Sequence, residues 1–261
     1  IKYYSIYFAF HSGMKLEKEH SNTLKLDGKQ TRYTDIVIRP FESCDSDVVR
    51  NIFAESMGEM RSPLVRDVMY QAIVYGLYLS LPAAVLSVVW FSWFLALYFI
   101  ILIFILIVLF AVLHIGFSRY IQQCLDTDLG DIENTYFQQK MSHLWVAECN
   151  QIVIGMVALV PDTDHEGCFG KSGEVVGRLR RMAVLPEFRR LGVAKQLLDT
   201  LLSYAKQVGY KQIVLLTTSA QEAAIKFYTK HNFQLVSKRL ANRAMRGFYH
   251  FDYSYDLERW K

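Results

Sequence analysis

Hydrophobic and polar residues follow two periodicities along this chain. Residues 34–41 alternate polar and apolar side chains, as a half-buried strand does, whereas the segments after Asp45 and over 191–208 repeat apolar residues at helical spacing. Further strands are predicted at 143–149, 152–160, 176–185, 213–218, 233–239 and 247–256, and a further helix at 220–231. Strands and helices that interleave in this way predict a mixed α/β (α+β) fold.

A much stronger signal interrupts this pattern early in the chain. Residues 68–118 contain no Asp, Glu, Lys or Arg, although a single membrane span needs only about 20 apolar residues. One helix of that length would be about 75 Å long, so we expect the segment to fold back as two spans near 70–90 and 95–117, with a break within the tryptophan-containing stretch 88–94. A buried helical pair in a water-soluble core is disfavoured, because apolar character on every face indicates lipid or very deep burial.

The apolar segment divides the chain into four predicted parts. They are a disordered N-terminal segment at 1–33, in which Met14 is an alternative start of translation, a first strand and helix at 34–67, a membrane hairpin at 68–118, and the rest of the globular domain at 119–261. Arg61 and Arg66 before the hairpin and Arg119 after it favour the cytosolic side for both flanks. A hairpin returns the chain to its starting side, so one domain can form from both flanks.

Charge and cysteine content exclude several classes of protein. The formal net charge of +4 implies no strongly basic face, so nucleic acid is not an expected partner. The four cysteines are scattered and form no CxxC pair, which argues against a zinc site or a redox dithiol. We expect reduced cysteines in a domain that faces the cytosol.

Two stretches carry candidate chemistry. The first, RMAVLPEFRRLGVAK at 181–195, joins a predicted strand to a predicted helix, and Gly192 and Ala194 let a ligand approach the backbone closely. The first N–H groups of a helix bind anions, and Arg189 and Arg190 add positive charge, so this stretch indicates pyrophosphate binding. Alone, its RxxGxA pattern is weak, because a basic surface turn before a helix has the same form.

The second stretch, QEAAIKFYTKHNF at 221–233, is a predicted helix followed by a strand. Ala224, Phe227 and Tyr228 are expected to face the sheet, and Asn232 is suited to a left-handed helix stop. Taken alone, Tyr228 is interpreted as a core aromatic residue with a solvated hydroxyl.

In combination, RxxGxA after a strand and AxxFYxxxxF in the next helix resemble the GNAT acetyltransferase superfamily. The resemblance covers residues 34–56 weakly and 143–256 well. The segments RMAV, GVAKQLL and LLTTSAQ, joined to an early hydrophobic hairpin, are similar to the camello-like group, which includes N-acetyltransferases for cysteine S-conjugates and for aspartate.

The resemblance implies acetyl-CoA as cosubstrate and no metal. It implies that the acetyl-CoA arm lies between the fourth and fifth strands, that Tyr228 protonates the leaving thiolate, and that Gln221 contacts the cofactor in place of an asparagine. The remaining cofactor-binding residues that it implies are Met182, Ala183, Val184, Arg189, Arg190, Leu191, Gly192, Val193, Ala194 and Lys195.

Two positions depart from the pattern of this family. Asn232 replaces a glycine, which is tolerable because asparagine visits the left-handed region. Arg178 stands where aspartate-acetylating relatives carry a glutamate, and it either binds a substrate carboxylate or is a solvated strand residue. The general base is therefore unassigned. The candidates are Glu148, Glu174 and His165, and Cys149 is a weaker candidate as an acyl carrier.

The predicted function is that of a membrane-anchored N-acetyltransferase in the lipid of the endoplasmic reticulum, with its catalytic domain facing the cytosol. The expected acceptor is a primary amine of a small amino acid or a cysteine S-conjugate. Two alternatives stay open, namely a protein lysine acetyltransferase of the secretory-pathway membrane and a non-catalytic CoA-binding module. A small transporter is disfavoured, because the apolar segment contains no intramembrane charged pair.

Overall fold

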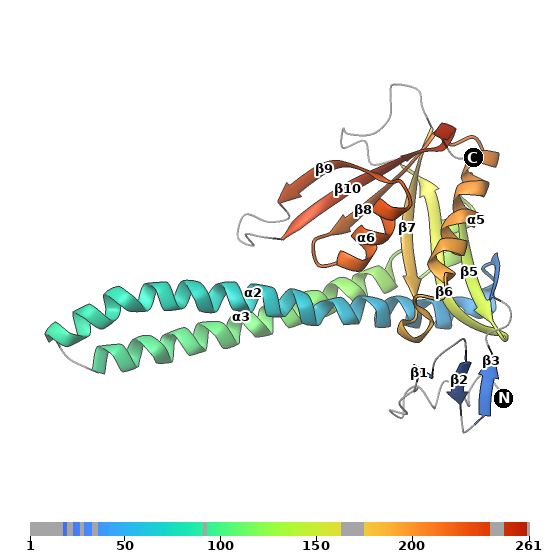
Figure 1. The fold of residues 1–261 in the computed structure, drawn as a ribbon. Helices are drawn as coiled ribbons and strands as arrows, with labels where there is room; N and C mark the ends of the chain where they lie inside the picture. Colours follow the sequence, from blue (N-terminus) through green and yellow to red (C-terminus); the bar gives the residue numbers. More distant parts are fainter. Residues whose placement is uncertain are drawn as a thin grey trace. The chain divides into compact units, whose positions relative to one another are not determined.

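The computed structural model of the chain describes residues 18–19, 23–26, 29–32, 36–90, 93–162, 175–240 and 248–259. Two compact units make up the fold (Figure 1). The first unit comprises residues 1–56, 131–215 and 254–261, and the second comprises residues 57–130 and 216–253. The apolar segment and the last helix and strands of the chain therefore belong to one unit.

A seven-stranded sheet forms the framework of the fold, in the order β4-β5-β6-β7-β8-β10-β9. The first four strands, β4 (Ile36–Pro40), β5 (His143–Cys149), β6 (Ile152–Pro161) and β7 (Val176–Val184), are antiparallel neighbours. The predicted mixed α/β fold is confirmed. Asn150 and Gln151 have φ of 52° and 66°, as in a two-residue type I′ turn, so the predicted tight turn between β5 and β6 is confirmed as well.

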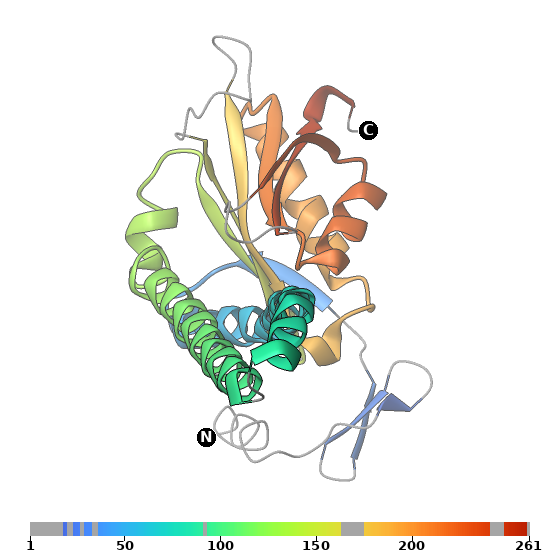
Figure 2. The ribbon, with the colours of Figure 1, turned by 90° about the vertical axis from the view of Figure 1, so that its left-hand side faces the viewer.

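Helix α5 (Val193–Gln207) covers one face of strands β5–β7 in the first unit (Figures 1 and 2). Its apolar residues recur at helical spacing, and this face is buried against the sheet. The helix ends at Gly209, whose φ is 93°, and the N–H of Tyr210 donates to the carbonyl oxygen of Ala205, as in a Schellman motif. The predicted helix, its buried face and its glycine stop are thus confirmed.

A charged cluster fixes the start of helix α2 to the edge of the sheet. Arg39 on β4 donates two hydrogen bonds to the carboxylate of Asp45, at 2.6 and 2.9 Å, and one to Glu148 on β5 at 2.6 Å. Helix α2 (Ser46–Trp90) begins directly after Asp45, and Val49, Ile52 and Phe53 of its first turns are buried. The paired carboxylates raise the pKa of Arg39, so this guanidinium is always charged.

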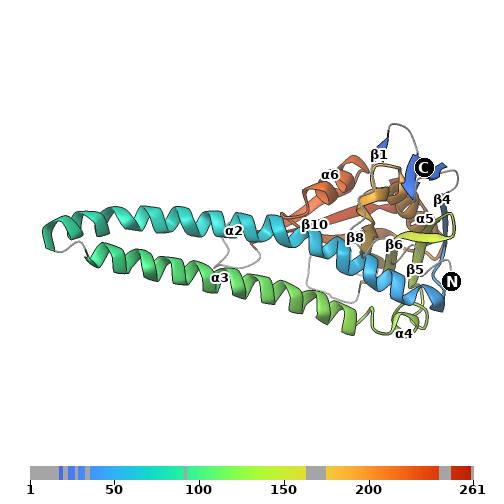
Figure 3. The ribbon, with the colours of Figure 1, turned by 90° about the horizontal axis from the view of Figure 1, so that it is seen from below.

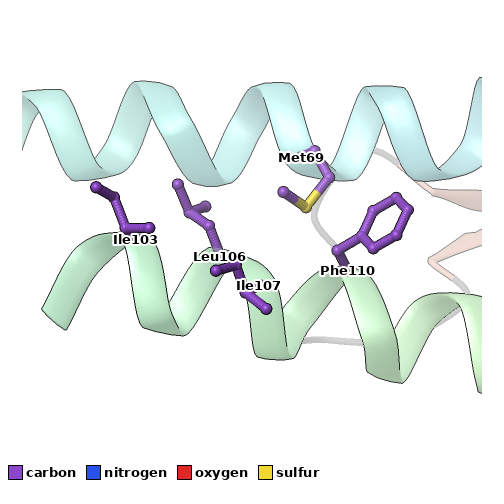
Figure 4. Close-up of a pocket in the computed structure, with 5 residues that line it drawn as sticks. All are labelled: Met69, Ile103, Leu106, Ile107 and Phe110. Carbon is purple, nitrogen blue, oxygen red and sulfur yellow. The ribbon is translucent and has the colours of Figure 1, made fainter. Parts of the chain in front are cut away.

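Two long helices dominate the second unit. In this unit α2 runs to Trp90 and α3 (Trp93–Asp126) returns beside it in the opposite direction (Figures 1 and 3). Met69 of α2 and four apolar residues of α3 line a groove between the two helices (Figure 4). The sequence predicts a separate first helix before the hairpin, whereas α2 is one uninterrupted helix, because extending a helix costs less than nucleating a second one.

The second unit also holds the C-terminal part of the sheet. Strand β8 (Gln212–Thr218) crosses from the first unit into the second, where α6 (Glu222–Lys230) and β9 (Gln234–Leu240) follow. Strand β10 (Tyr249–Asp256) begins in the second unit, and its residues from Ser254 on belong to the first. The short helix α4 (Ile132–Tyr136) belongs to the first unit.

The structure describes three short pieces of the N-terminal segment. Three short strands, β1 (Lys18–Glu19), β2 (Thr23–Leu26) and β3 (Lys29–Arg32), pair in a separate antiparallel sheet. Leu26 pairs with Lys29, and the two residues between them in the sequence are Asp and Gly, a strong hairpin signal.

Candidate active site

Strand β7 carries a bulge near its C-terminal end. Its register with β6 pairs Arg180 with Ala158 and Ala183 with Met156, so that two residues of β7, Arg181 and Met182, face one residue of β6. Arg181 has a φ of 55°, in the left-handed region. A bulge of this kind bends the strand and re-aims the backbone groups that follow it, here those of the predicted cofactor strand Met182–Val184.

Strands β7 and β8 are parallel neighbours over only a short distance. Their register runs from the Val176–Gln212 pair to the Arg178–Val214 pair, whereas β7 itself continues to Val184. Two parallel strands that pair at their first residues alone leave a sheet open at its carboxyl end, where ligands bind in α/β sheets. The acetyl-CoA position that the family resemblance implies, between the fourth and fifth strands of this sheet, stays a prediction.

The loop after β7 leads into the start of α5 through left-handed backbone. Arg190 has a φ of 64°, and Gly192, the residue that precedes α5, has a φ of 83°. No side chain caps this helix, and the first bond of its ladder runs from the N–H of Gln196 to the carbonyl oxygen of Gly192. The N–H groups at the helix start therefore have no acceptor within the helix, which makes this terminus suited to a phosphate group.

Space and charge around this helix start also fit an anion. A Cβ atom built at Gly192 would meet no atom within 4 Å, so the glycine leaves open space beside the backbone. Arg190 is exposed, whereas Arg189 donates from Nε to the carbonyl oxygen of Val184 at 3.1 Å and Lys195 pairs with Asp199 at 2.7 Å. Of these three cationic side chains, that of Arg189 connects the loop to β7 through its hydrogen bond to Val184.

Tyr228 lies within the second unit, on α6. Its side chain is 6% exposed, and its ring packs against Phe227 and Phe233 at centroid distances of 5.5 and 5.4 Å. Asn232 has a φ of 65°, and the N–H of Phe233 donates to the carbonyl oxygen of Tyr228, so the predicted asparagine helix stop is confirmed. Burial raises the pKa of the Tyr228 hydroxyl, which therefore keeps its proton at physiological pH.

Gln221 precedes α6 and is held in place by its neighbour on β8. The hydroxyl of Thr217, a buried residue, donates to the Gln221 side-chain oxygen at 2.5 Å. The backbone N–H of Gln221 donates to the carbonyl oxygen of Thr218 at 2.9 Å. These two bonds fix the orientation of the amide, with its NH₂ group directed away from Thr217.

The structure gives ion-pair partners to two residues that the sequence singles out. Arg178 contacts the Asp162 carboxylate through Nε at 2.7 Å and Nη2 at 2.6 Å, and the side chains are 17% and 7% exposed. Glu148 is paired with Arg39 at 2.6 Å.

The other base and acyl-carrier candidates are placed as follows. His165 and Glu174 lie outside the described residues. Cys149 is 2% exposed within β5, and it is one of three free cysteines among the described residues, with Cys44 and Cys124. Within the described part of the chain, no group of three His, Cys, Asp or Glu side chains is arranged to hold a metal ion.

Comparison with known proteins identifies the class. Residues 111–233 match the model of the acetyltransferase (GNAT) family. The protein is thus an acetyl-CoA-dependent N-acetyltransferase with the GNAT fold.

Relatives over most of the chain narrow this class. N-acetyltransferase 8 of Rattus norvegicus is 32% identical over 197 residues, which cover 76% of this chain and 85% of the relative. N-acetyltransferase family 8 member 2 of the same species is 30% identical over 224 residues, covering 83% of this chain and 94% of the relative. The chain belongs to the N-acetyltransferase 8 family, the camello-like group. A solved GNAT acetyltransferase from Staphylococcus aureus Mu50 aligns with a TM-score of 0.48 at 17% identity, over 85% of this chain and 99% of that one.

Sequence reasoning missed three residues around the site. Asp162 and Thr217 hold Arg178 and Gln221, and Arg181 forms the bulge in β7. A carboxylate at the end of a strand and a threonine four residues before Gln221 are ordinary features that single out neither residue. The bulge has no sequence signal, because a glycine would normally mark a left-handed strand position.

Proposed function

We propose that this enzyme holds acetyl-CoA along the bulged end of β7 and at the start of α5, and that it acetylates a primary amine beside a membrane. The observation that carries the cofactor site is the uncapped start of α5, where Gly192 has a φ of 83° and open space beside it. The pyrophosphate is assigned to residues 189–195, and the pantetheine arm to the backbone of Met182–Val184.

The proposed chemistry is direct transfer. A backbone N–H of the bulged strand polarises the acetyl carbonyl as the acceptor amine forms its new C–N bond. The C–S bond breaks, and Tyr228 gives its hydroxyl proton to the departing thiolate. Burial raises the pKa of the Tyr228 hydroxyl, so its proton is present before transfer. The proton that the amine loses is taken up by a base that stays unassigned.

The proposed acceptor is the α-amine of a small amino acid or of a cysteine S-conjugate. Membership of the N-acetyltransferase 8 family supports an amine acceptor. A lipid setting would concentrate apolar conjugates beside the enzyme. Arg178 is proposed as the group that attracts the acceptor carboxylate, through the fork that it now shares with Asp162. In that role Arg178 would give up its ion pair with Asp162 and bind the carboxylate of the acceptor instead.

A membrane hairpin made of the later part of α2 and of α3 is the proposed anchor. Among the described residues, one helix, Ala96–Asp126, is long and apolar enough to span a membrane, and none of its apolar window is buried. Strand β4 precedes the apolar segment and pairs with β5, which follows it. This pairing supports an even number of crossings, because both strands must lie on one side. The cytosolic face of the endoplasmic reticulum is proposed as that side.

A matched pair of glycine substitutions tests the cofactor site. Gly192 and Gly209 lie at opposite ends of α5, both have positive φ, and a Cβ atom at either would meet nothing within 4 Å. Gly192→Leu and Gly209→Leu should therefore lose similar stability, whereas only Gly192→Leu should lose acetyl-CoA binding. Calorimetric titration with acetyl-CoA measures this difference. Equal affinity in the two variants would overturn the assignment of the site.

A competition panel tests the acceptor. Purified enzyme and acetyl-CoA are supplied with benzyl-cysteine, aspartate or a lysine peptide, and thiol release is compared. We expect benzyl-cysteine to be the best acceptor, and Arg178→Ala to raise its KM with little change in kcat. Turnover of the lysine peptide alone would refute the small-molecule acceptor. Thiol release with none of the three would show that the acceptor belongs to another class of amine.

Protease protection in sealed microsomes tests the topology. Epitope tags at the N-terminus and the C-terminus should be digested together from the cytosolic side. Opposite protection of the two tags would exclude a hairpin.

A further inference from the structure

We infer that Arg181 is a positioning residue, which holds the β7 bulge in place by stacking its guanidinium on Phe53 of α2. The inference rests on the proposed function, in which the backbone after the bulge binds acetyl-CoA. Arg181 itself is assigned no contact with the cofactor. Its role is to fix the direction in which the backbone of Met182–Val184 leaves the bulge.

The backbone of Arg181 needs such support. The left-handed region is unfavourable for a residue with a Cβ atom, and bulges that use it normally carry glycine. Arg181 adopts a φ of 55° in the middle of the sheet, where two residues of β7 face Val157 alone. A strained conformation of this kind persists only when the surrounding structure holds it.

The side chain of Arg181 supplies that support. Its guanidinium carbon lies 4.7 Å from the ring centroid of Phe53, within the range of a cation–π contact. Phe53 is 2% exposed, and it belongs to the first turns of α2, which the Arg39–Asp45 ion pair fixes to the sheet edge. The contact therefore joins the bulge to a rigid part of the first unit.

The strand on the far side of the bulge is held by close packing. A Cβ atom built at Gly155 on β6 would lie 3.0 Å from the carbonyl oxygen of Ala183 and 3.2 Å from the side chain of Val184. The backbone of β7 thus lies directly against β6 once the bulge is passed. The contact with Phe53 restrains one side of the bulge, and close packing on Gly155 restrains the other. A restrained backbone suits a strand that binds a ligand.

A double-mutant cycle on the full-length enzyme in nanodiscs tests the contact. Arg181→Met keeps the length of the side chain and removes its charge, and Phe53→Leu keeps apolar packing and removes the ring face. Each single variant should raise the KM for acetyl-CoA by about threefold to tenfold. The double variant should raise it no further, because both changes remove one contact. Hydrogen exchange should become faster in peptides that span 179–185.

Two further variants separate positioning from general destabilisation. Phe41→Leu removes another buried ring of the same unit, one that stacks on Phe137, and should lower the Tm while leaving the KM unchanged. Arg181→Gly removes the anchor together with the backbone strain that the anchor offsets, so its KM should rise less than that of Arg181→Met.

Unchanged KM and hydrogen exchange in the Arg181 and Phe53 variants would overturn the inference, as would additive effects in the double variant. Failure of the proposed function is distinguishable from these outcomes, because it would appear as acetyl-CoA binding that Gly192→Leu leaves intact.

Discussion

Helices α3 and α5 are both rich in leucine, isoleucine and valine, yet they meet their surroundings in opposite ways. Helix α5 buries one face, which includes Leu197, Leu198 and Leu201, and leaves its polar face exposed. Helix α3 is apolar on every side, and residues such as Phe104 and Ile107 are 65% and 61% exposed. Exposed apolar surface on this scale is unfavourable in water. Lipid is therefore the surrounding that we propose for α3, whereas the sheet covers α5.

The fraction of a side chain that is buried within the protein therefore does not by itself identify the surroundings in which an apolar residue is stable. An exposed position in water tolerates most substitutions within about 0.5 kcal/mol. An exposed position in lipid rejects a charge as a buried core does. The effect of an aspartate substitution therefore distinguishes whether a helix position is surrounded by protein core, lipid or water.

The largest effect is expected in α5. Leu201 is 0% exposed, and Leu201→Asp leaves an uncompensated charge in the core, which should cost about 3–5 kcal/mol. This loss is a large part of the stability of a typical domain, so the variant should lose its resistance to limited proteolysis. Gln196→Asp, at an exposed position of the same helix, is the control and should remain resistant.

A smaller effect is expected in α3, at a position that the chain itself leaves exposed. Ile107→Asp should reduce membrane integration by about 2.5–3.5 kcal/mol, while Ile107→Leu should have no effect. An in vitro translation assay with a glycosylation reporter measures the integrated fraction. If Ile107→Asp integrates normally, α3 does not lie in lipid, and the contrast with α5 disappears.

The third effect concerns a titratable ring beneath α5. His143 stacks on Tyr204 of α5 at 5.3 Å, and burial lowers the pKa of His143 below its ordinary value. The unfolded chain then binds a proton more readily than the folded one, so stability is complete above the unfolded pKa, about 6.5, and falls as the pH drops below it. His143→Phe should flatten the decrease in Tm between pH 7.5 and pH 5.5. An unchanged pH profile would assign the acid sensitivity to other groups.

The smallest effect is expected between the two long helices. The Tyr98 hydroxyl of α3 donates to the carbonyl oxygen of Gly76 on α2 at 2.6 Å, and Leu102 packs on the same glycine. Hydrogen bonds between membrane helices contribute about 0.6 kcal/mol on average, so Tyr98→Phe should weaken the hairpin only slightly. Steric-trapping measurements in bicelles can resolve a change of this size, and a loss of several times that value would contradict it.

Much of the fold could be predicted, because local signals and tertiary packing agree. The apolar spacing of α5, Gly209 after it, Asn150 and Gln151 between two strands, and Asn232 after α6 all act through nearby residues. The continuity of α2 could not be predicted, because the sequence shows where apolar character begins but not whether the helix stops before it. The pairing of β2 with β3 was not predicted, because the segment around these strands is polar in composition.

The candidate site was predictable where it depends on backbone, and not where it depends on distant partners. Gly192 and its helix start follow from residue type and position, since a glycine before a helix both frees the backbone and allows positive φ. The partners Asp162 of Arg178 and Arg39 of Glu148 are set by sheet register. A single sequence does not contain the register of β4 with β5, in which Arg39 and Glu148 are 109 residues apart, nor that of β6 with β7.

The pairing of β4 with β5 has a consequence for how the protein folds during its synthesis. Ile36 faces Cys149, and the whole apolar segment is translated between these two residues. The first strand of the sheet therefore leaves the ribosome long before its partner, and long-range strand pairing of this kind is slow in any case. Strands β4 and β5 can pair only after α2 and α3 have been synthesised and, in the proposed topology, inserted into the membrane. A ribosome-bound chain that fails to deliver its hairpin should consequently fail to complete its acetyltransferase domain.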